Sequence, residues 1–207
     1  MMRARLLSVL PNHVSCFTTI MGSFLYVKDM KKSNGGNAVI DCCKTKGVPA
    51  VELYNPKSLE YQIEFDAFPD NALPLSKGHY EEQCECVMFP ENSDQNEWVL
   101  FIETKYAEKL ESAKNPQYRY PEKMVEQIRK TVKYFRDKNI LSPNKVVYAI
   151  ISFPFIEEGF ESWSFPIKKK DGTLESVEDI LFNDKIHIRA TNHAILKNKS
   201  QILLGEM

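Results

Sequence analysis

The fold is decided by the stretch WVLFIETK, residues 98–105. Its first five residues are apolar, and a strand that is apolar on both faces is typical of the inside of a covered sheet. Because side chains alternate along a strand, Glu103 and Lys105 are predicted on the same face as Phe101. The two charged groups then lie about 7 Å apart at the end of the strand.

A second strand is predicted just before this one, over residues 84–89, and the polar turn 90–96 joins the two as a hairpin. Alternation puts Glu85 on one face with Val87 and Phe89. If the hairpin pairs in the matching register, the Glu85 carboxylate lies beside that of Glu103.

The residues after the motif predict a helix and a further strand. Pro121 opens a helix that reaches about Lys138 and carries its apolar residues on one stripe. Residues 145–153 form another apolar, β-rich run that ends at Pro154. The stripe consists of Met124, Val125, Ile128, Val132 and Phe135.

The flanking regions predict further short elements. Residues 14–27 are expected to form a strand or buried hairpin around Gly22-Ser23, and residues 31–37 a loop. Ser58 is expected to cap a short helix that ends before Pro69. The C-terminal third has β-like segments at 163–167, 185–190 and 194–204, with a hairpin turn at Asp171-Gly172.

Together these patterns predict an α/β (α+β) fold with a central mixed β-sheet flanked by helices. The 207 residues suit one domain spanning 1–207. Its core is expected at about 55–155, with an N-terminal β segment (1–47) and a β-rich C-terminal segment (156–207) packed on it.

The charged strand ends suggest a chemistry. Two converging carboxylates form a hard oxygen site of the kind that Mg²⁺ prefers. A nearby ammonium could orient or deprotonate a water molecule, or stabilise a pentacovalent phosphate. A metal ion would polarise the phosphoryl oxygen and lower the water pKa. The residue types therefore indicate phosphodiester hydrolysis.

An acid on one strand, Glu-x-Lys at the end of the next, then a helix and a strand, resembles the PD-(D/E)XK nuclease superfamily. The likeness covers about residues 55–155 and implies a restriction-endonuclease-like core. It implies that Glu103 is a metal-binding acid, that Lys105 is the motif lysine, and that Glu85 stands where the family usually has aspartate. Glu85, Glu103 and Lys105 would be catalytic, and the two acids would bind Mg²⁺ or Mn²⁺.

The resemblance also suggests supporting or substrate-binding residues. Many members place a glutamate on the preceding helix, for which Glu60 and Glu64 are candidates. The RecB-like branch has Gln-x-x-x-Tyr on the following helix, where this chain has Gln127 with Tyr134 seven residues later. Lys130 on the solvated side of that helix could contact phosphate.

Composition limits the class of protein. Hydrophobic residues make up 43%, charged residues 27%, and the net charge is −1, so nucleic acid would need a local basic patch. Five cysteines, two of them adjacent, argue against a disulfide framework and favour the cytoplasm. The apolar run near Arg3 and Arg5 is too short for a signal peptide, and no membrane contact is expected. Nucleic acid is the expected partner, and a homodimer is a possible assembly.

Rival functions remain open. The chain could be a non-catalytic module that binds nucleic acid or protein on the same scaffold. Cys84 and Cys86 could suggest zinc, but two sulfurs about 7 Å apart on a strand do not share one ion, and buried structural thiols explain them better. The sequence has no Walker loop, Rossmann glycine pattern or Gly-x-Ser-x-Gly elbow.

Overall fold

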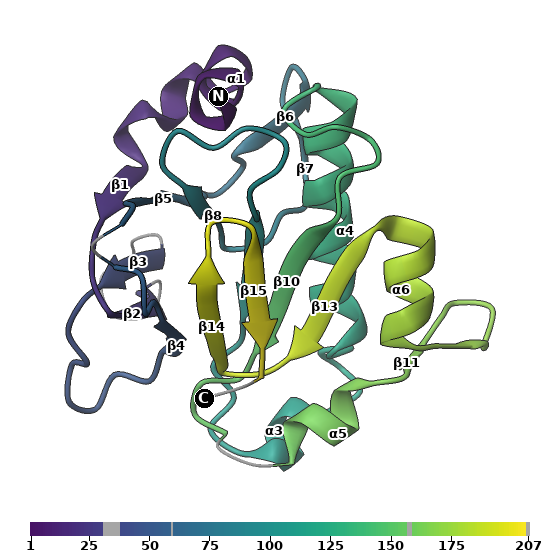
Figure 1. Ribbon diagram of the computed structural model, residues 1–207. Coiled ribbons are helices and arrows are strands. Elements are labelled where there is room, and N and C mark those ends of the chain that lie inside the picture. The colour runs from purple at the N-terminus through teal and green to yellow at the C-terminus, as the bar shows by residue number, and fades with distance from the viewer. Residues whose placement is uncertain (31–37, 59, 157–158, 206–207) are drawn as a thin grey trace.

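The computed structural model describes residues 1–30, 38–58, 60–156 and 159–205. A six-stranded mixed sheet lies at its centre (Figure 1). In spatial order its strands are β1 (Phe17–Ile20), β5 (Ile63–Ala67), β8 (Cys86–Pro90), β9 (Leu100–Thr104), β10 (Val147–Ser152) and β13 (Ile186–Ala190).

The strand predicted from residues 98–105 is an inner strand of this sheet. It is β9, which pairs antiparallel with β8 on one side and parallel with β10 on the other. The helix α4 (Glu122–Asp137) connects β9 to β10, as the one-striped pattern predicted. The predicted hairpin, helix and following strand are therefore confirmed.

A second sheet of five strands packs against the central one. In spatial order its strands are β15 (Gln201–Leu204), β14 (His193–Asn198), β4 (Val51–Tyr54), β2 (Phe24–Asp29) and β3 (Ala38–Asp41). The chain passes between the two sheets three times, after β1, after β4 and after β13.

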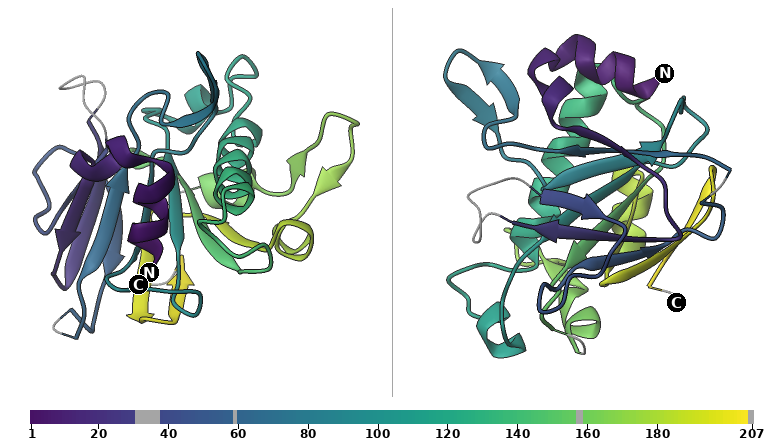
Figure 2. Two further views of the ribbon diagram at one scale, coloured as in Figure 1. Left: turned by 90° about the horizontal axis from the view of Figure 1, so that it is seen from above. Right: turned by 90° about the vertical axis from the view of Figure 1, so that its left-hand side faces the viewer.

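The molecule thus has three layers, which Figure 2 shows from above as sheet, sheet and helix. One apolar core lies between the central sheet and α4, and includes Val99, Phe101 and Phe135. The other lies between the two sheets, and includes Leu100, Ile102 and Trp98. The alternation predicted for β9 is confirmed, because odd and even residues enter different cores.

Smaller elements surround these layers. The N-terminal segment and the two short hairpins lie at the periphery (Figure 1). The bounds are α1 (Met2–Val9), the 3-10 helix η1 (Pro11–Ser15), β6 (Leu73–Ser76), β7 (His79–Glu81), α3 (Leu110–Ala113), α5 (Phe160–Ser164), β11 (Ile167–Lys168), β12 (Leu174–Glu175) and α6 (Val177–Asp184).

The helix predicted after Ser58 is wrong, because residues 63–67 form strand β5. Ile63 and Phe65 enter the core between the sheets, while Glu64 and Asp66 lie on the opposite face. Both faces of this strand are buried. The spacing of the apolar residues satisfied a helix and a strand alike, and strand pairing with β1 and β8 decided between them.

Strand structure predicted over residues 14–27 is confirmed, but the predicted hairpin is wrong. Its two strands, β1 and β2, belong to different sheets, and the chain turns from one to the other around Gly22. A Cβ atom at Gly22 would lie 2.6 Å from the Cys42 sulfur, so a larger residue there would require the Cys42 side chain to shift. The loop predicted over 31–37 lies outside the described residues.

The C-terminal third was predicted in part. Residues 163–167 are not a strand, since α5 ends at Ser164 and β11 begins only at Ile167. The turn at Asp171-Gly172 does join a hairpin, β11 and β12, and residues 194–204 contain β14 and β15. Helix α6 was not predicted, although Ser176 and Asp179 form a capping box at its start.

Within the described residues, no helix is long and apolar enough to cross a membrane. The apolar N-terminal run forms α1, which buries Met2 and Leu6 in the core beside α4. Cys84 and Cys86 are buried as expected for structural thiols, whereas Cys42 and Cys43 are exposed.

Candidate functional site

The site begins where β8 and β9 lie side by side. The regular pairing ends with Cys86 opposite Ile102, and the Glu85 amide still donates to the Ile102 carbonyl at 3.0 Å, which attaches Glu85 to the end of β9. Glu103 is completely buried and Glu85 is 5% exposed. The structure therefore places the two predicted carboxylates beside each other at the edge of the apolar core.

Lys105 completes the predicted cluster. Its backbone amide donates to the Ser152 carbonyl on β10 at 2.9 Å, which fixes the chain just beyond β9. Its ammonium forms an ion pair with Glu103 and lies 3.6 Å from a Glu85 oxygen. Burial alone would lower the Lys105 pKa, but the charges of Glu103 and Glu85 raise it above its ordinary value.

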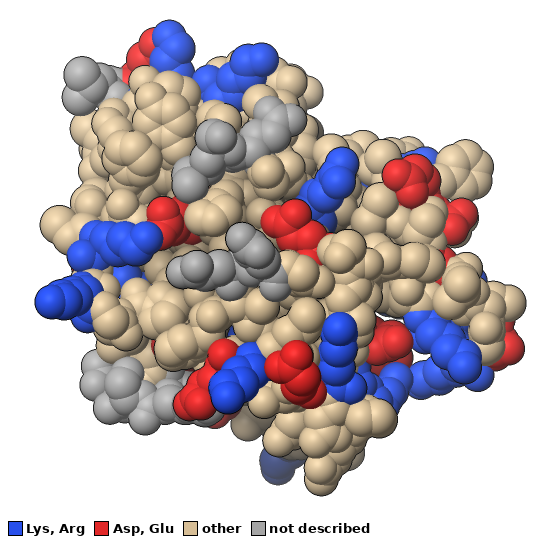
Figure 3. Space-filling view, turned by 90° about the horizontal axis from the view of Figure 1, so that it is seen from below, with Lys and Arg blue, Asp and Glu red and all other residues tan. Residues whose placement is uncertain are grey.

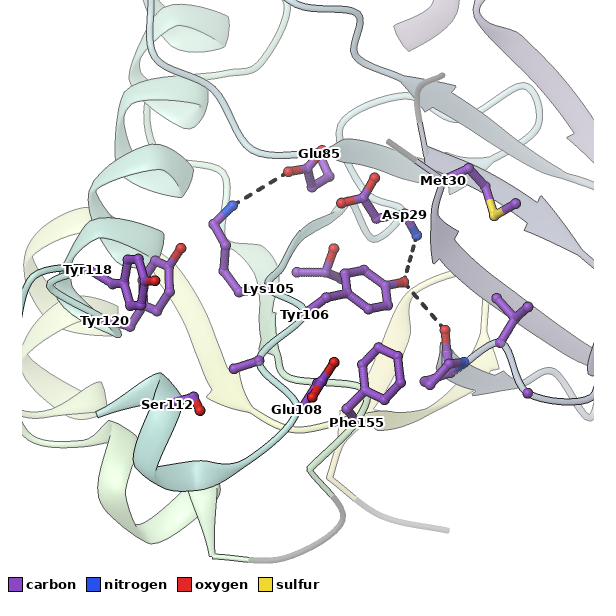
Figure 4. A pocket seen from close by; sticks show the side chains of 15 residues that line it. Asp29, Met30, Glu85, Lys105, Tyr106, Glu108, Ser112, Tyr118, Tyr120 and Phe155 are labelled. Atoms are coloured by element: carbon purple, nitrogen blue, oxygen red, sulfur yellow. Dashed lines mark hydrogen bonds and ion pairs between the residues drawn. The ribbon is translucent and has the colours of Figure 1, made fainter. Parts of the chain in front are cut away.

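Glu85 and Lys105 line a pocket of about 770 Å³ between the end of the central sheet and the second sheet (Figure 4). This volume lies within the range of roughly 300–1,000 Å³ that is typical of ligand sites. The walls come from several separate segments of the chain. They are residues 29–30, 47–49, Glu85, 104–108, Ser112, Tyr118, Tyr120 and Phe155.

Tyr106 forms one wall and ties the two sheets together. Its hydroxyl accepts a hydrogen bond from the Asp29 amide at 2.8 Å and donates to the Pro49 carbonyl at 3.4 Å. Burial, aided by the charges of Asp29 and Glu85, raises the Tyr106 pKa to about 12. The phenol is therefore neutral at physiological pH and keeps its proton to donate.

Aromatic rings stand on both sides of Lys105 in the view of Figure 4. Tyr118 and Tyr120 are stacked, with centroids 5.6 Å apart and planes at 16°. On the other side Phe155 packs edge-on against Tyr106, with centroids 5.5 Å apart. Tyr118 is 49% exposed and Phe155 44%, so a ligand in the pocket could reach both.

The structure does not bring the predicted supporting residues into this pocket. Glu64 lies on β5 rather than on a helix, and it pairs with Arg3 at 2.9 Å. Gln127 donates to the Gln83 carbonyl, and Tyr134 to the Pro74 carbonyl. Lys130 pairs with Glu82 at 2.8 Å. Their contacts attach α1 to β5, and α4 to the segment between β5 and β8.

Sequence reasoning missed several residues of the pocket. Asp29 is the first member of a second acid-x-Lys triplet, residues 29–31, and it lines the same pocket as Lys105. The repetition of the acid-x-Lys pattern at residues 29–31 is the sequence signal that could have identified Asp29 as a residue of the site. The tyrosines at 118 and 120, directly before the helix-opening Pro121, carried no recognised pattern.

The predicted donors for a metal are the carboxylates of Glu85 and Glu103, and the acidic residues Asp29 and Glu108 also line the pocket. Among the described residues, no group of three or more His, Cys, Asp or Glu side chains is arranged to hold an ion. The neighbouring thiols are poor candidates, because burial and the nearby acidic charges raise the pKa of both Cys84 and Cys86. Comparison with protein-family models, curated proteins and solved structures finds no match to this chain.

Proposed function

We propose that this chain is a metal-dependent nuclease that hydrolyses phosphodiester bonds of DNA or RNA at a PD-(D/E)XK-type site. The observation that carries the proposal is the convergence of Glu85, Glu103 and Lys105 at the ends of two neighbouring strands, beside a pocket. The order of elements adds support. The acid-bearing strand β8, the Glu-x-Lys strand β9, helix α4 and the parallel strand β10 follow one another.

Mg²⁺ or Mn²⁺ is the ion that the donor set fits, held by Glu85 and Glu103. Mg²⁺ commonly takes only one or two carboxylates from a protein and completes its coordination with water and substrate phosphate. A third protein ligand is therefore not required. When bound, the ion would polarise a phosphoryl oxygen and lower the pKa of a coordinated water.

The charge state of Lys105 limits the roles that this residue could have in catalysis. The ordinary pKa of a lysine is about 10.4, so its ammonium is protonated at neutral pH and, from its place beside both carboxylates, can donate hydrogen bonds to a phosphate oxygen or to the attacking water. A neutral amine would be needed to remove a proton from water. Stabilisation of the developing negative charge on phosphate is therefore the role that we assign to Lys105, in preference to that of general base.

One observation favours a second candidate, a non-catalytic module that binds nucleic acid or protein. The Lys105 ammonium already pairs with both carboxylates and supplies positive charge where a metal would. In that case the cluster would stabilise the strand ends only. Titration with Mn²⁺ separates the two candidates, because the module would bind no ion there.

The test measures cleavage of labelled single-stranded and duplex DNA and RNA with Mg²⁺ or Mn²⁺, alongside Mn²⁺ binding by calorimetry. We expect Glu85→Gln and Glu103→Gln to lose Mn²⁺ affinity and cleavage together. Lys105→Ala should slow cleavage by about 100- to 1,000-fold, as for other groups that stabilise a transition-state charge.

Glu178→Gln is the matched control, since Glu178 is an exposed carboxylate on α6, outside the pocket. It should leave cleavage and Mn²⁺ binding unchanged. Circular dichroism of each variant checks that it is folded. Cleavage that survives in excess EDTA, or that both glutamine variants retain, would overturn the proposal.

A further inference from the structure

The pocket has a charged floor, formed by Glu85 and Lys105, and two walls of aromatic rings. Tyr118 and Tyr120 offer a stacked pair on one side, and Phe155 with Tyr106 offers a second pair on the other. Tyr106 is held by its hydrogen bonds to Asp29 and Pro49. Rings fixed in this way present flat apolar surfaces at little cost in conformational entropy.

Flat aromatic surfaces beside the proposed catalytic cluster of Glu85, Glu103 and Lys105 are suited to binding a nucleotide. Nucleobases stack on tyrosine and phenylalanine, and stacking is sequence-tolerant because every base has a π-face. A base inside a duplex is already covered on both faces by its neighbours. Only an unpaired base can offer its faces to the protein, so the walls select single strands, loops or ends.

The basic side chains around the pocket contribute only modestly to the binding of phosphate. Arg119 lies between Tyr118 and Tyr120 in the sequence and has a left-handed backbone conformation (φ 53°). The rings of the two tyrosines that flank it are stacked on one wall of the pocket. Arg119 lines a neighbouring pocket with Lys168 and Lys170, but Glu126 lies 3.6 Å from Arg119 and 3.9 Å from Lys170.

On the face drawn in Figure 3, Lys and Arg are likewise interspersed with Asp and Glu. A basic surface gains affinity for nucleic acid because it neutralises phosphates and releases their counterions. A surface on which basic and acidic side chains are interspersed gains little affinity in this way.

We infer that the pocket binds an unpaired nucleotide of single-stranded nucleic acid, with its base stacked on Tyr118 and its phosphate directed toward Lys105. Stacking supplies most of the affinity, and charge supplies a smaller part. The inference deepens the proposed function and rests on it for the identity of the substrate, but binding can be measured without cleavage.

The experiment is fluorescence anisotropy with labelled 12-nucleotide oligomers in EDTA. Single-stranded DNA, single-stranded RNA and a blunt DNA duplex are the three probes, so that the two sources of an unpaired base are distinguished. We expect at least one single strand to bind about tenfold or more tighter than the duplex. Tyr118→Ala should weaken that binding by about 5- to 150-fold, the range for loss of one base–aromatic stack.

Tyr80→Ala is the matched control, because Tyr80 is 47% exposed, close to the 49% of Tyr118, and lies on β7 outside the pocket. It should bind single strands as the unmodified protein does. Tyr118→Phe should retain binding, since the ring is kept. Tighter binding of the duplex, equal binding by Tyr118→Ala, or no binding of any oligomer overturns the inference.

The two proposals fail in different ways. Binding of single strands that depends on Tyr118, without cleavage in Mg²⁺ or Mn²⁺, leaves the inference standing and removes the nuclease. Metal-dependent cleavage of duplex only, lost in Glu103→Gln and unaffected by Tyr118→Ala, leaves the nuclease standing and removes the inference.

Discussion

Replacing Lys105 with methionine tests the electrostatics of the site directly. The change keeps an unbranched side chain but removes the ammonium that pairs with Glu103 and Glu85. Removing one partner of a buried ion pair costs about 3–5 kcal/mol. The Lys105 side chain is 21% exposed, so we expect the lower end, about 3 kcal/mol. For a chain of this length that lowers Tm by about 6–12 °C.

The loss should depend on pH. In the unmodified protein the Lys105 pKa is raised, so its contribution is complete below about pH 10 and is lost only at higher, strongly alkaline pH. In Lys105→Met the two carboxylates lose the compensating ammonium, and a buried carboxyl group that loses opposing charge is more stable in its protonated, neutral form. Their cost is then relieved as pH falls, so the variant should be closer to the unmodified protein at pH 5 than at pH 8.

The assay is urea unfolding followed by circular dichroism at both pH values. Lys133→Met is the control, since Lys133 is 74% exposed and pairs with Asp137 within α4; such a surface pair contributes only about 0.3–0.5 kcal/mol. A Lys105→Met variant within about 1 kcal/mol of the unmodified protein at pH 8, with the same pH dependence, would refute this account of the cluster.

Two further predictions concern the fold. Phe101→Ala should lower the free energy of unfolding by about 3–5 kcal/mol in chemical denaturation, because Phe101 is fully buried between the central sheet and Phe135 of α4. A loss below about 1 kcal/mol would contradict that packing. Ser176→Ala should cost about 1 kcal/mol by removing the hydrogen bond that caps α6, and Ser162→Ala, an exposed serine elsewhere, should cost less.

The middle of the chain could be predicted because its signals are local and agree with one another. Residues 98–102 are apolar without interruption, and the stripe on α4 has one period throughout. Each pattern matches a single kind of element, and the short connection between 84–89 and 98–105 leaves the hairpin as the simplest arrangement. Alternation predicted the strand face of each acid, and a matching hairpin register was the further condition for Glu85 to lie beside Glu103.

Strand β5 could not be predicted in this way, because distant residues stabilise its charged face. Glu64 is paired with Arg3, 61 positions earlier, and the buried Asp66 contacts His13 at 2.8 Å, 53 positions earlier. Without these partners a buried pair of acids on a strand is unfavourable, and a solvated helix is the more natural prediction.

The pocket was missed for a similar reason. Asp29 reaches it from the second sheet, and its amide contacts Tyr106, 77 positions later in the chain. Tyr118 and Tyr120 reach it from the irregular segment before α4, where no periodicity applies. Local sequence patterns therefore predicted the charged residues Glu85 and Lys105 of the pocket, but not the residues of its walls.

The threefold passage of the chain between the two sheets has a consequence for how the protein unfolds. Asn192, at the last crossing, accepts a hydrogen bond from Ser152 at 2.6 Å and donates to the Phe153 and Ile156 carbonyls, so the crossing itself is fixed to β10. The two sheets are therefore joined at three crossings and also share one apolar core, to which β4 contributes Leu53 and β9 contributes Leu100. We therefore expect the amide protons of both sheets to exchange with solvent through one shared opening event, with similar protection in β4 and β9.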